Sequence, residues 1–335
     1  DQDLEAVVLR VMADTRVESL QPNQVFEGMA ERTTVPYNDP YASLQHGALA
    51  IRADAAHAVA TGKGVKVAIV DTGVETDHPD LQGRIVQTQN FVEGGEQSFR
   101  QDRHGTAVAG VIGAKPNNQL GIFGVAPDAE LLVAKACWHR EPTVPQALCS
   151  SWTLAKALDF SFLAGAQVVN LSLGGPQDAL LARLLLKLAT HGTIVVAAGL
   201  DGLGGNVGMD LGFPASHEAV IGVVSGNRDG RPRSTEWGKR QAPLIAPGQE
   251  IVTTVPKQAY DVLSGSSLAA AHVTGAIALL LEHHPRLTSG QTYTLLQRTV
   301  RTGEGHGLTP SSERAGGIID VCAALNDLLH RQACR

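Results

Sequence analysis

Ser267 lies in a stretch whose residue types could support nucleophilic chemistry. Gly265, two hydroxyl residues and a long apolar run follow one another between residues 265 and 275. This pattern predicts a tight turn that opens a buried helix, with Ser267 at or near its first turn. Free N–H groups and the positive end of the helix dipole favour a developing negative charge there. Ser267 is therefore either a helix cap or a nucleophile that carries part of its own oxyanion hole.

Two upstream stretches supply the partners that a serine nucleophile needs. Asp71 follows an apolar run and precedes a glycine turn, where its carboxylate either holds an Asx turn or orients a base. His104 opens a run of small and apolar residues, where it is either a structural residue or a general base. Together with Ser267, these residues fit a nucleophile, a base and an orienting acid. The combination favours the catalytic interpretation of each residue.

The elements that must position these residues alternate between strands and helices. Apolar runs typical of buried parallel strands occupy residues 65–70, 130–136, 166–171, 193–198 and 219–224. Helical patterns occupy residues 52–60, 104–114, 151–164, 178–191, 267–284, 288–300 and 318–330. This order predicts an α/β fold, a parallel β-sheet with helices on both faces. In such a sheet the functional groups gather at the carboxyl ends of the strands.

The N-terminal part of the chain has a different pattern. Residues 4–12 predict a short amphipathic helix, and residues 16–23 predict a strand that ends in a turn. Residues 28–48 show little periodicity and contain Pro36 and Pro40, which is typical of a linker. We therefore expect a small α+β segment with its linker at residues 1–35 and the main domain at residues 36–335.

Composition and charge exclude several classes of function. The chain has 335 residues, 43% of them hydrophobic, which is enough to bury a large core in one or two domains. Its net charge of −6 argues against a nucleic-acid partner or an anionic membrane surface. No apolar run approaches the ~20 residues of a membrane span. We expect neither a nucleic-acid partner nor a membrane span.

The cysteines indicate the compartment. They form two near pairs, Cys137 with Cys149 and Cys322 with Cys334, and have no zinc-ligand spacing. Disulfides in an oxidising compartment are therefore favoured over a metal site, with buried free thiols as the alternative. The chain begins at Asp1 without a signal-like segment, so a targeting peptide has been removed or was never included. We expect a secreted or periplasmic protein.

The stretches around Asp71, His104 and Ser267 resemble the Asp, His and Ser boxes of the subtilisin-like serine proteases, in that family's order. Other landmarks of the family occur in the right order: GVAP at residues 124–127, VNLSLGG at 169–175, FPAS at 213–216 and APG at 246–248. The resemblance covers roughly residues 44–300. It implies the family's fold and a serine endopeptidase activity on peptide or protein substrates. It also implies that residues 3–27 are the closing half of an inhibitory propeptide that binds its own enzyme, with a maturation junction within residues 27–37.

The resemblance assigns roles by matched position. Ser267 would attack the scissile carbonyl, His104 would transfer the proton, and Asp71 would fix the imidazole tautomer and stabilise its charged form. Gly199 would lie at the wall of the pocket for the substrate side chain that precedes the scissile bond. The substrate backbone would pair, as an added strand, with Ser172, Leu173 and Gly174.

Two departures from the family pattern bear on catalysis. Leu200 stands where the family has an oxyanion-hole asparagine, and leucine cannot donate a hydrogen bond. The backbone N–H of Ser267 and the hydroxyl of Ser266 could still donate, and the loop at residues 201–210 could bring Asn206 to the site. Ala271 replaces a proline, which restores a main-chain N–H and removes a helix kink. We predict a serine endopeptidase with an atypical oxyanion hole; the alternative is a catalytically impaired fold that binds extended peptides or a partner protein.

A cation site is a further implication of the resemblance. Residues 116–122 resemble the family's calcium loop, where an asparagine side chain and alternate backbone carbonyls supply oxygen ligands. Asp80 matches the carboxylate that completes that site, whereas the family's glutamine ligand has no clear match. The implied Ca²⁺ ligands are Asp80, Pro116, Asn118, Leu120 and Ile122. The alternative is a turn rich in asparagine and glycine that holds no ion.

Overall fold

The computed structural model describes residues 4–17, 36–93, 96–140, 147–200, 211–227, 242–301 and 317–334. The chain divides into two compact units, Asp1–Thr34 and Val35–Arg335. In the first unit the expected helix is present as α1 (Leu4–Met12). The strand expected at residues 16–23 and the expected maturation junction lie almost wholly outside the described residues.

A seven-stranded sheet forms the centre of the second unit, in the order β2-β3-β1-β6-β7-β8-β9, with every neighbouring pair parallel. Five strands confirm the expected apolar runs: β1 (Lys66–Asp71), β3 (Glu130–Lys135), β6 (Val168–Leu171), β7 (Ile194–Ala198) and β8 (Val220–Gly226). The sequence pattern missed the two edge strands, β2 (Ile85–Asn90) and β9 (Leu244–Pro247). Strand β2 is largely exposed and polar, and β9 has only four residues, so neither has the long apolar run of a central strand.

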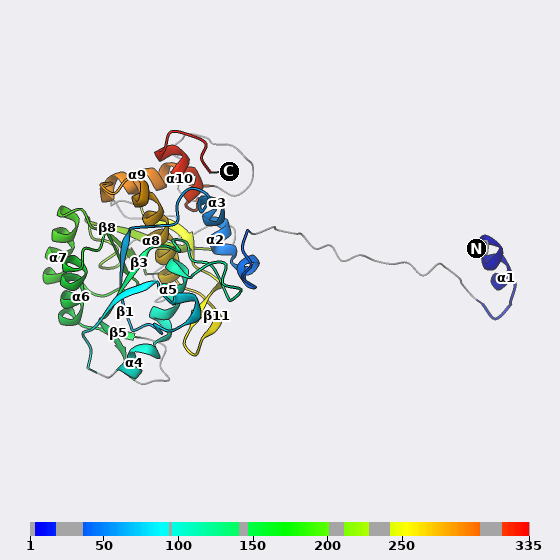
Figure 1. Ribbon diagram of the computed structural model, residues 1–335, viewed down its shortest axis with the longest axis horizontal. Helices are drawn as coiled ribbons and strands as arrows, with labels where there is room; N and C mark the ends of the chain where they lie inside the picture. Colours follow the sequence, from blue (N-terminus) through cyan, green and yellow to red (C-terminus); the bar gives the residue numbers. More distant parts are fainter. Residues whose placement is uncertain are drawn as a thin grey trace. The chain divides into compact units, whose positions relative to one another are not determined.

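Helices cover both faces of this sheet, as expected. Helices α5 (Arg103–Gly113) and α8 (Ser266–His283) pack on one face, and α6 (Ser151–Leu163) and α7 (Ala179–Thr190) pack on the other, with the strands between them in Figure 1. Along β1, Val67 and Ile69 join the core beneath α5 and α8, whereas Ala68 and Val70 join the core beneath α6 and α7. Because successive side chains point to opposite faces, a strand buried on both faces must be apolar throughout.

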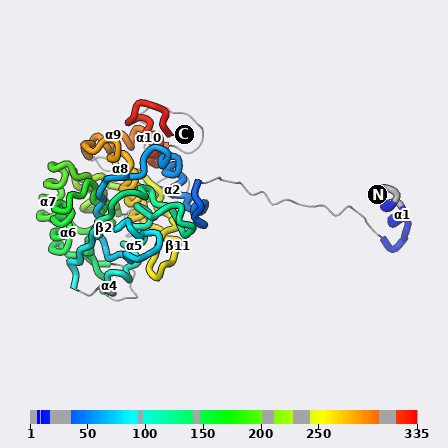
Figure 2. The backbone as a smooth tube through the Cα atoms, viewed as in Figure 1, coloured from blue at the N-terminus to red at the C-terminus, as the bar shows by residue number. Residues whose placement is uncertain are grey.

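Helix α8 is the most deeply buried helix of this arrangement. Every residue from Leu268 to Leu281 is buried, which agrees with an apolar pattern all around the helix. The helix continues through Ala271, where the family pattern has proline. Near the C-terminus, α9 (Ser289–Arg298) and α10 (Val321–Leu328) lie next to each other, and α10 packs against α8 (Figure 2).

The segment before β1 differs from our expectations. The helix expected at residues 52–60 is confirmed only as the short α3 (Ala53–Ala56) and is wrong for the residues after it; Arg52, whose φ is 60°, separates α3 from the preceding α2 (His46–Ala50). The linker expected at residues 28–48 is also wrong for its described part. Gln45 is only 6% exposed and bonds both main-chain groups of Phe123. These contacts fix the segment to the core.

Smaller elements complete the unit. Two antiparallel hairpins, β4 (Cys137–His139) with β5 (Ala147–Cys149) and β10 (Ile251–Val255) with β11 (Ala259–Leu263), accompany the main sheet. Single turns of 3₁₀ helix form η1 (Ala42–Leu44) and η2 (Pro79–Leu81), and α4 (Glu96–Arg100) precedes α5. Among the helices of the described residues, none has the length and hydrophobicity that crossing a bilayer requires.

Both expected disulfides are present. Cys137–Cys149 joins β4 to β5, with a Cα–Cα distance of 4.2 Å. Cys322–Cys334 has a Cα–Cα distance of 5.5 Å, because the chain turns back after α10. Asn326 holds this turn: its Oδ1 accepts the main-chain N–H groups of Ala333 and Cys334 at 2.7 and 2.8 Å.

Candidate active site

Asp71 and His104 form a hydrogen-bonded pair at the carboxyl end of the sheet. Asp71 is the last residue of β1 and is 3% exposed, and His104 is the second residue of α5. His104 Nδ1 lies 2.8 Å from Asp71 Oδ1 and 3.0 Å from Oδ2. Asp71 Oδ1 also accepts the main-chain N–H of Thr72 at 2.6 Å. Since the carboxylate only accepts, Nδ1 carries the proton and Nε2 of the neutral ring is left as the base.

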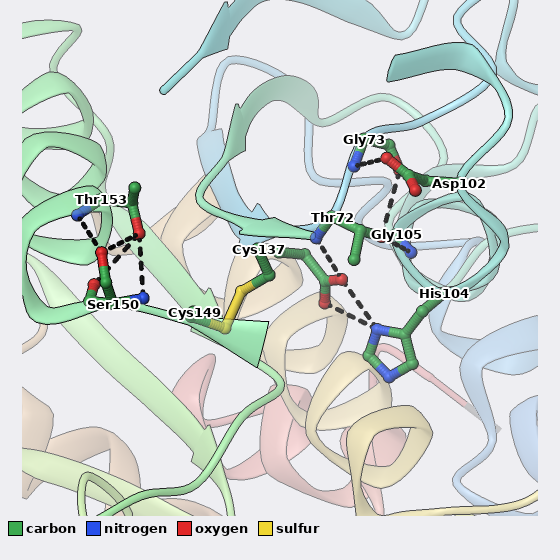
Figure 3. Close-up of a disulfide and its surroundings, with 10 residues drawn as sticks. Thr72, Gly73, Asp102, His104, Gly105, Cys137, Cys149, Ser150 and Thr153 are labelled. Atoms are coloured by element: carbon green, nitrogen blue, oxygen red, sulfur yellow. Dashed lines mark hydrogen bonds and ion pairs between the residues drawn. A yellow bond between two sulfur atoms is a disulfide. The ribbon is translucent and has the colours of Figure 1, made fainter. Parts of the chain in front are cut away.

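Close packing of α5 against the end of β1 sets the position of His104. The N–H of Gly105 donates to Thr72 Oγ1 at 3.0 Å (Figure 3). A Cβ atom at Gly105 would collide with the carbonyl oxygen of Gly73, and one at Gly73 would collide with the main chain of Phe99. Glycine at position 105 therefore allows the start of α5 to approach the strand end closely enough for the Asp71 pair, and glycine at position 73 leaves room for the main chain of α4.

A buried ion pair beside His104 escaped the sequence analysis. Asp102, the N-cap of α5, is 7% exposed, and it pairs with Lys135 at the end of β3, which is 3% exposed. Asp102 Oδ2 also accepts the N–H of Gly73 at 2.8 Å (Figure 3). The ammonium group and the N–H compensate a carboxylate that would otherwise be costly to bury. A charged residue at a strand end looks like a surface residue in sequence, so only the fold reveals the pair.

Ser267 meets the Asp71–His104 pair at a shared cavity. It is the second residue of α8, in the first turn, where main-chain N–H groups have no partner within the helix. Ser267 and His104 line two adjoining cavities of about 1340 and 840 Å³, and Asp71 also lines the smaller one. No hydrogen bond joins the side chains of Ser267 and His104 within the described part of the chain. Such bonds often tighten only when substrate is bound.

The residues expected to bind substrate line the 840 Å³ cavity as well. Ser172, Leu173 and Gly174 directly follow β6, a central strand of the sheet. Among the described residues, none is hydrogen-bonded to the main chain of Leu173 or Gly174, so these groups are available to an added strand. Gly199 lies at the end of β7 and lines the same cavity. Much of the remaining lining is apolar and includes Leu154, Leu181, Leu185 and Phe213.

Leu200 lies beside the first turn of α8, which carries Ser267, and its side chain is largely exposed. The carbonyl of Gly199 accepts the hydroxyl of Ser266 at 2.6 Å, which ties this segment to the start of α8. Leu200 itself is 58% exposed, and its side chain rests in space left by two glycines. A Cβ atom at Gly174 or Gly212 would lie 2.9 or 2.6 Å from a Leu200 methyl carbon. The hydroxyl proton of Ser266 is thus engaged by Gly199, and Asn206 lies outside the described residues.

Two buried carboxylates converge on the loop at residues 116–122. Asp80 is 0% exposed and accepts Nδ2 of Asn118 at 2.8 Å and the N–H of Ile122 at 3.0 Å. Asp39 is 5% exposed and accepts the N–H groups of Asn117 and Asn118 at 2.8 and 3.0 Å. Asp39 escaped the sequence analysis because its neighbours, an asparagine and a proline, were interpreted as part of a linker.

The chemistry of this loop suits an oxygen-preferring cation. Neither Asp39 nor Asp80 forms an ion pair with a described lysine or arginine. The neighbouring His78 accepts the N–H of Asp80 through Nδ1 at 3.2 Å, and its Nε2 donates to the carbonyl of Ala259 at 3.1 Å. Buried carboxylates are usually paired or bound to a metal. No cluster of three or more histidine, cysteine or acidic side chains that could hold a metal occurs in the described ranges, so further ligands would be amide and carbonyl oxygens.

A helix-borne serine and an Asp–His pair, gathered at the carboxyl edge of one parallel sheet, are the arrangement of a serine hydrolase. Residues 62–316 match the subtilase family. The chain is 34% identical over 282 residues to an intracellular serine protease of Paenibacillus polymyxa, covering 79% of this chain and 84% of that one. It is 35% identical over 246 residues to thermitase of Thermoactinomyces vulgaris, covering 72% of this chain and 84% of that one. It is 34% identical over 286 residues to subtilisin E of Bacillus subtilis strain 168, covering 84% of this chain and 71% of that one. The chain therefore belongs to the subtilase family and is a subtilisin-like serine endopeptidase.

The electrostatics of His104 predict the pH dependence of the reaction. Burial of the ring by itself lowers the pKa of His104, but the charge of Asp71 and its hydrogen bond raise this pKa above the ordinary value. Because the base must be neutral, kcat/KM should rise with pH through a midpoint above the ordinary histidine pKa of about 6.5. In Asp71→Asn the midpoint of this pH profile should move to lower pH. The limiting value of kcat/KM at high pH should fall by about 10⁴-fold.

Steady-state kinetics on one peptide substrate between about pH 5 and 9 measure this profile. A wild-type midpoint at or below the ordinary value would contradict the assignment. The same raised pKa has a consequence for stability. The contribution of the pair is fully present below the pKa of the unfolded histidine and is lost as the pH rises through the higher folded value.

Proposed function

We propose that this endopeptidase cleaves peptide bonds through Ser267, His104 and Asp71, by way of an acyl-enzyme. The observation that carries the proposal is the pair between His104 Nδ1 and the Asp71 carboxylate on the same cavity as Ser267. Ser267 Oγ attacks the scissile carbonyl and gives its proton to His104 Nε2, which passes it to the leaving amine. Water then attacks the ester with the same histidine as base. Asp71 holds Nδ1–H and stabilises the imidazolium.

The substrate is an extended peptide with an apolar residue before the scissile bond. The main chain at residues 172–174 pairs with the peptide as an added strand, using groups with no hydrogen bond to the described residues. The side chain before the scissile bond enters the 840 Å³ cavity beside Gly199. The leucine and phenylalanine side chains that line this cavity favour an apolar group, since burying a charge there would be costly.

The oxyanion hole is reduced in this proposal. The N–H of Ser267, in the first turn of α8, donates to the developing oxyanion. Leu200 adds no donor at the position of the family's asparagine, and the hydroxyl of Ser266 is bonded to Gly199. Catalysis therefore proceeds with fewer oxyanion donors than the family pattern provides.

Replacement of the nucleophile tests the proposal directly. Ser267→Ala should lower kcat by about 10⁶-fold while the protein keeps its fold, because only the attacking oxygen is removed. A fluorophosphonate probe should label the wild-type protein and not the variant, with thermal unfolding as the control for folding. Turnover within a few-fold of wild type in Ser267→Ala would refute the assignment. A folded wild-type protein that is neither labelled nor active would instead support the peptide-binding alternative.

Leu200 determines how much catalysis the site delivers. Leu200→Asn should raise kcat, by up to about 10²–10³-fold, because it restores a donor aimed at charge that exists only in the transition state. KM should change much less. Leu200→Ala is the control, since it also removes the leucine side chain and supplies no donor. An unchanged or lower kcat in a stably folded Leu200→Asn protein would show that the oxyanion is stabilised by other groups.

We also propose a Ca²⁺ site at the loop of residues 116–122. The ligands are oxygen atoms of Asp80 and Asp39, the Asn118 side chain and the main-chain carbonyls of Pro116, Leu120 and Ile122. The ion would supply the positive charge that the two buried carboxylates lack among the described residues. Its hard, oxygen-preferring chemistry matches this donor set.

Thermal unfolding measures the proposed ion independently of activity. At a Ca²⁺ concentration of about 100 Kd, binding should add about 2.7 kcal/mol to the free energy of unfolding, and a chelator should remove it. Mg²⁺ should substitute poorly, since it demands tighter octahedral geometry. Asp39→Asn and Asp80→Asn should each reduce the response to Ca²⁺. A Tm that is the same with chelator and with added Ca²⁺ would refute the site.

We further propose that residues 1–35 are a remnant of the inhibitory propeptide that binds the catalytic domain, and that the protein is secreted or periplasmic. Supporting observations are the separate N-terminal unit and the two disulfides, which persist in oxidising compartments. The relatives include an intracellular protease, so family membership alone does not indicate the compartment.

A further inference from the structure

A chain of hydrogen bonds links the interior of α8 to the segment after β6. Thr274 Oγ1 donates to Asn170 Oδ1 at 2.9 Å, and Asn170 Nδ2 donates to Ser172 Oγ, also at 2.9 Å. Ser172 Oγ in turn contacts the carbonyl oxygen of Ser267 at 3.3 Å, as donor. Thr274 and Asn170 are both 0% exposed. The chain thus begins in the core and ends at the main chain of the nucleophile.

The two ends of this chain belong to the two elements that must meet in the reaction. Thr274 lies seven residues after Ser267 on α8, which is about two helical turns, so both residues face the same side. Asn170 lies in β6, and Ser172 begins the segment proposed to pair with the substrate main chain. The hydrogen bonds therefore close a ring between the helix that carries the nucleophile and the segment that holds the substrate.

The hydrogen-bond partner of the Thr274 hydroxyl is determined by tertiary structure and not by its own helix. A threonine inside a helix can donate to the carbonyl four residues earlier. In α9 and at its end, Thr294 and Thr299 do so, at 2.8 Å to Gly290 and 2.9 Å to Leu295. Thr274 donates across to Asn170 instead.

The side-chain amide of Asn170 is also bonded to partners that only the tertiary structure brings together. An asparagine in a strand buried on both faces is costly unless its amide is hydrogen-bonded. Here Oδ1 accepts from Thr274 and Nδ2 donates to Ser172, so both ends of the amide are used. The amide therefore has one orientation, and it transmits the position of α8 to the segment after β6.

We propose that Thr274 and Asn170 are positioning residues for peptide-bond cleavage, which set the place of Ser267 relative to the substrate-binding segment. The inference rests on the proposed function of Ser267. Neither residue touches substrate; both act through Ser172 and the backbone of the nucleophile. A small displacement of Ser267 from the bound carbonyl slows attack strongly and leaves main-chain pairing of the substrate intact.

The near-isosteric variant Thr274→Val tests the inference. It removes the donor and leaves Asn170 Oδ1 without that bond. We expect kcat to fall by about 10- to 100-fold while KM stays within about two-fold. The rate of fluorophosphonate labelling should fall in parallel, because it reports attack by Ser267 without peptide binding. Thr274→Ser keeps the hydroxyl and should restore both rates.

Thr292→Val is the matched control. Thr292 lies in α9, is 0% exposed, and its hydroxyl has no hydrogen-bond partner among the described residues. This substitution should leave kcat and the labelling rate unchanged. If Thr274→Val lowers Tm but keeps the wild-type kcat and labelling rate well below its Tm, Thr274 is structural only and the inference is wrong.

Ser172→Ala tests the other end of this chain of hydrogen bonds. It also provides the test if Thr274→Val does not fold. It should lower kcat in the same range, with KM again nearly unchanged. A double variant that loses no more than the worse single variant supports one coupled chain, whereas additive losses overturn it. A wild-type protein that the probe does not label refutes the proposed function. Normal labelling of wild type and Thr274→Val alike refutes the positioning role alone.

Discussion

The close approach of α5 to the end of β1 is the constraint on which the active site depends. The pair between His104 and Asp71 exists because a helix start and a strand end meet at main-chain distance. Gly105 makes that approach possible, because a Cβ atom there would collide with the main-chain carbonyls of Thr72 and Gly73. The buried Asp102–Lys135 pair also stabilises the contact between α5 and the end of β1, because Asp102 accepts the N–H of Gly73. The base is thus oriented by packing as much as by its own hydrogen bond.

Helix α8 supplies the second half of the site by a different means. It is buried from Leu268 to Leu281, so its position is set by the sheet beneath it. Only its first turn reaches the cavity, where Ser267 combines a reactive hydroxyl with an N–H that has no partner within the helix. The contact from Ser266 to Gly199 and the chain through Asn170 tie this turn to two strand ends. Ser267 and the segment proposed to bind the substrate therefore share one support.

Several buried polar groups in this protein fix the position of another group. Asn170 and Thr274 bond one another inside an otherwise apolar layer. Asp39 and Asp80 order the loop at residues 116–122 by accepting its N–H groups. Leu200 is the opposite case: an exposed apolar side chain rests between Gly174 and Gly212 at a position where a polar one would contribute to catalysis. In the proposed mechanism the site therefore has one oxyanion donor fewer and an apolar side chain beside the substrate.

The sequence determined the central strands, the main helices and the family, because strands buried on both faces and apolar helices leave strong local patterns. The boxes around Asp71, His104 and Ser267 were visible for the same reason, since each combines a reactive residue with glycine and small neighbours. Edge strands β2 and β9 left no comparable pattern, because exposure and short length weaken it.

Tertiary structure decided what depends on contacts between distant residues. Asp39 has the local sequence of a turn, and only packing against Asn117 and Asn118 makes it a buried carboxylate of the loop. Lys135 and Asp102 are 33 residues apart and meet only in the folded sheet. A threonine inside a helix can donate to a carbonyl of its own helix, yet Thr274 donates to a residue 104 positions away. A sequence specifies which groups need partners, whereas the partner of each is decided by which elements the core brings together.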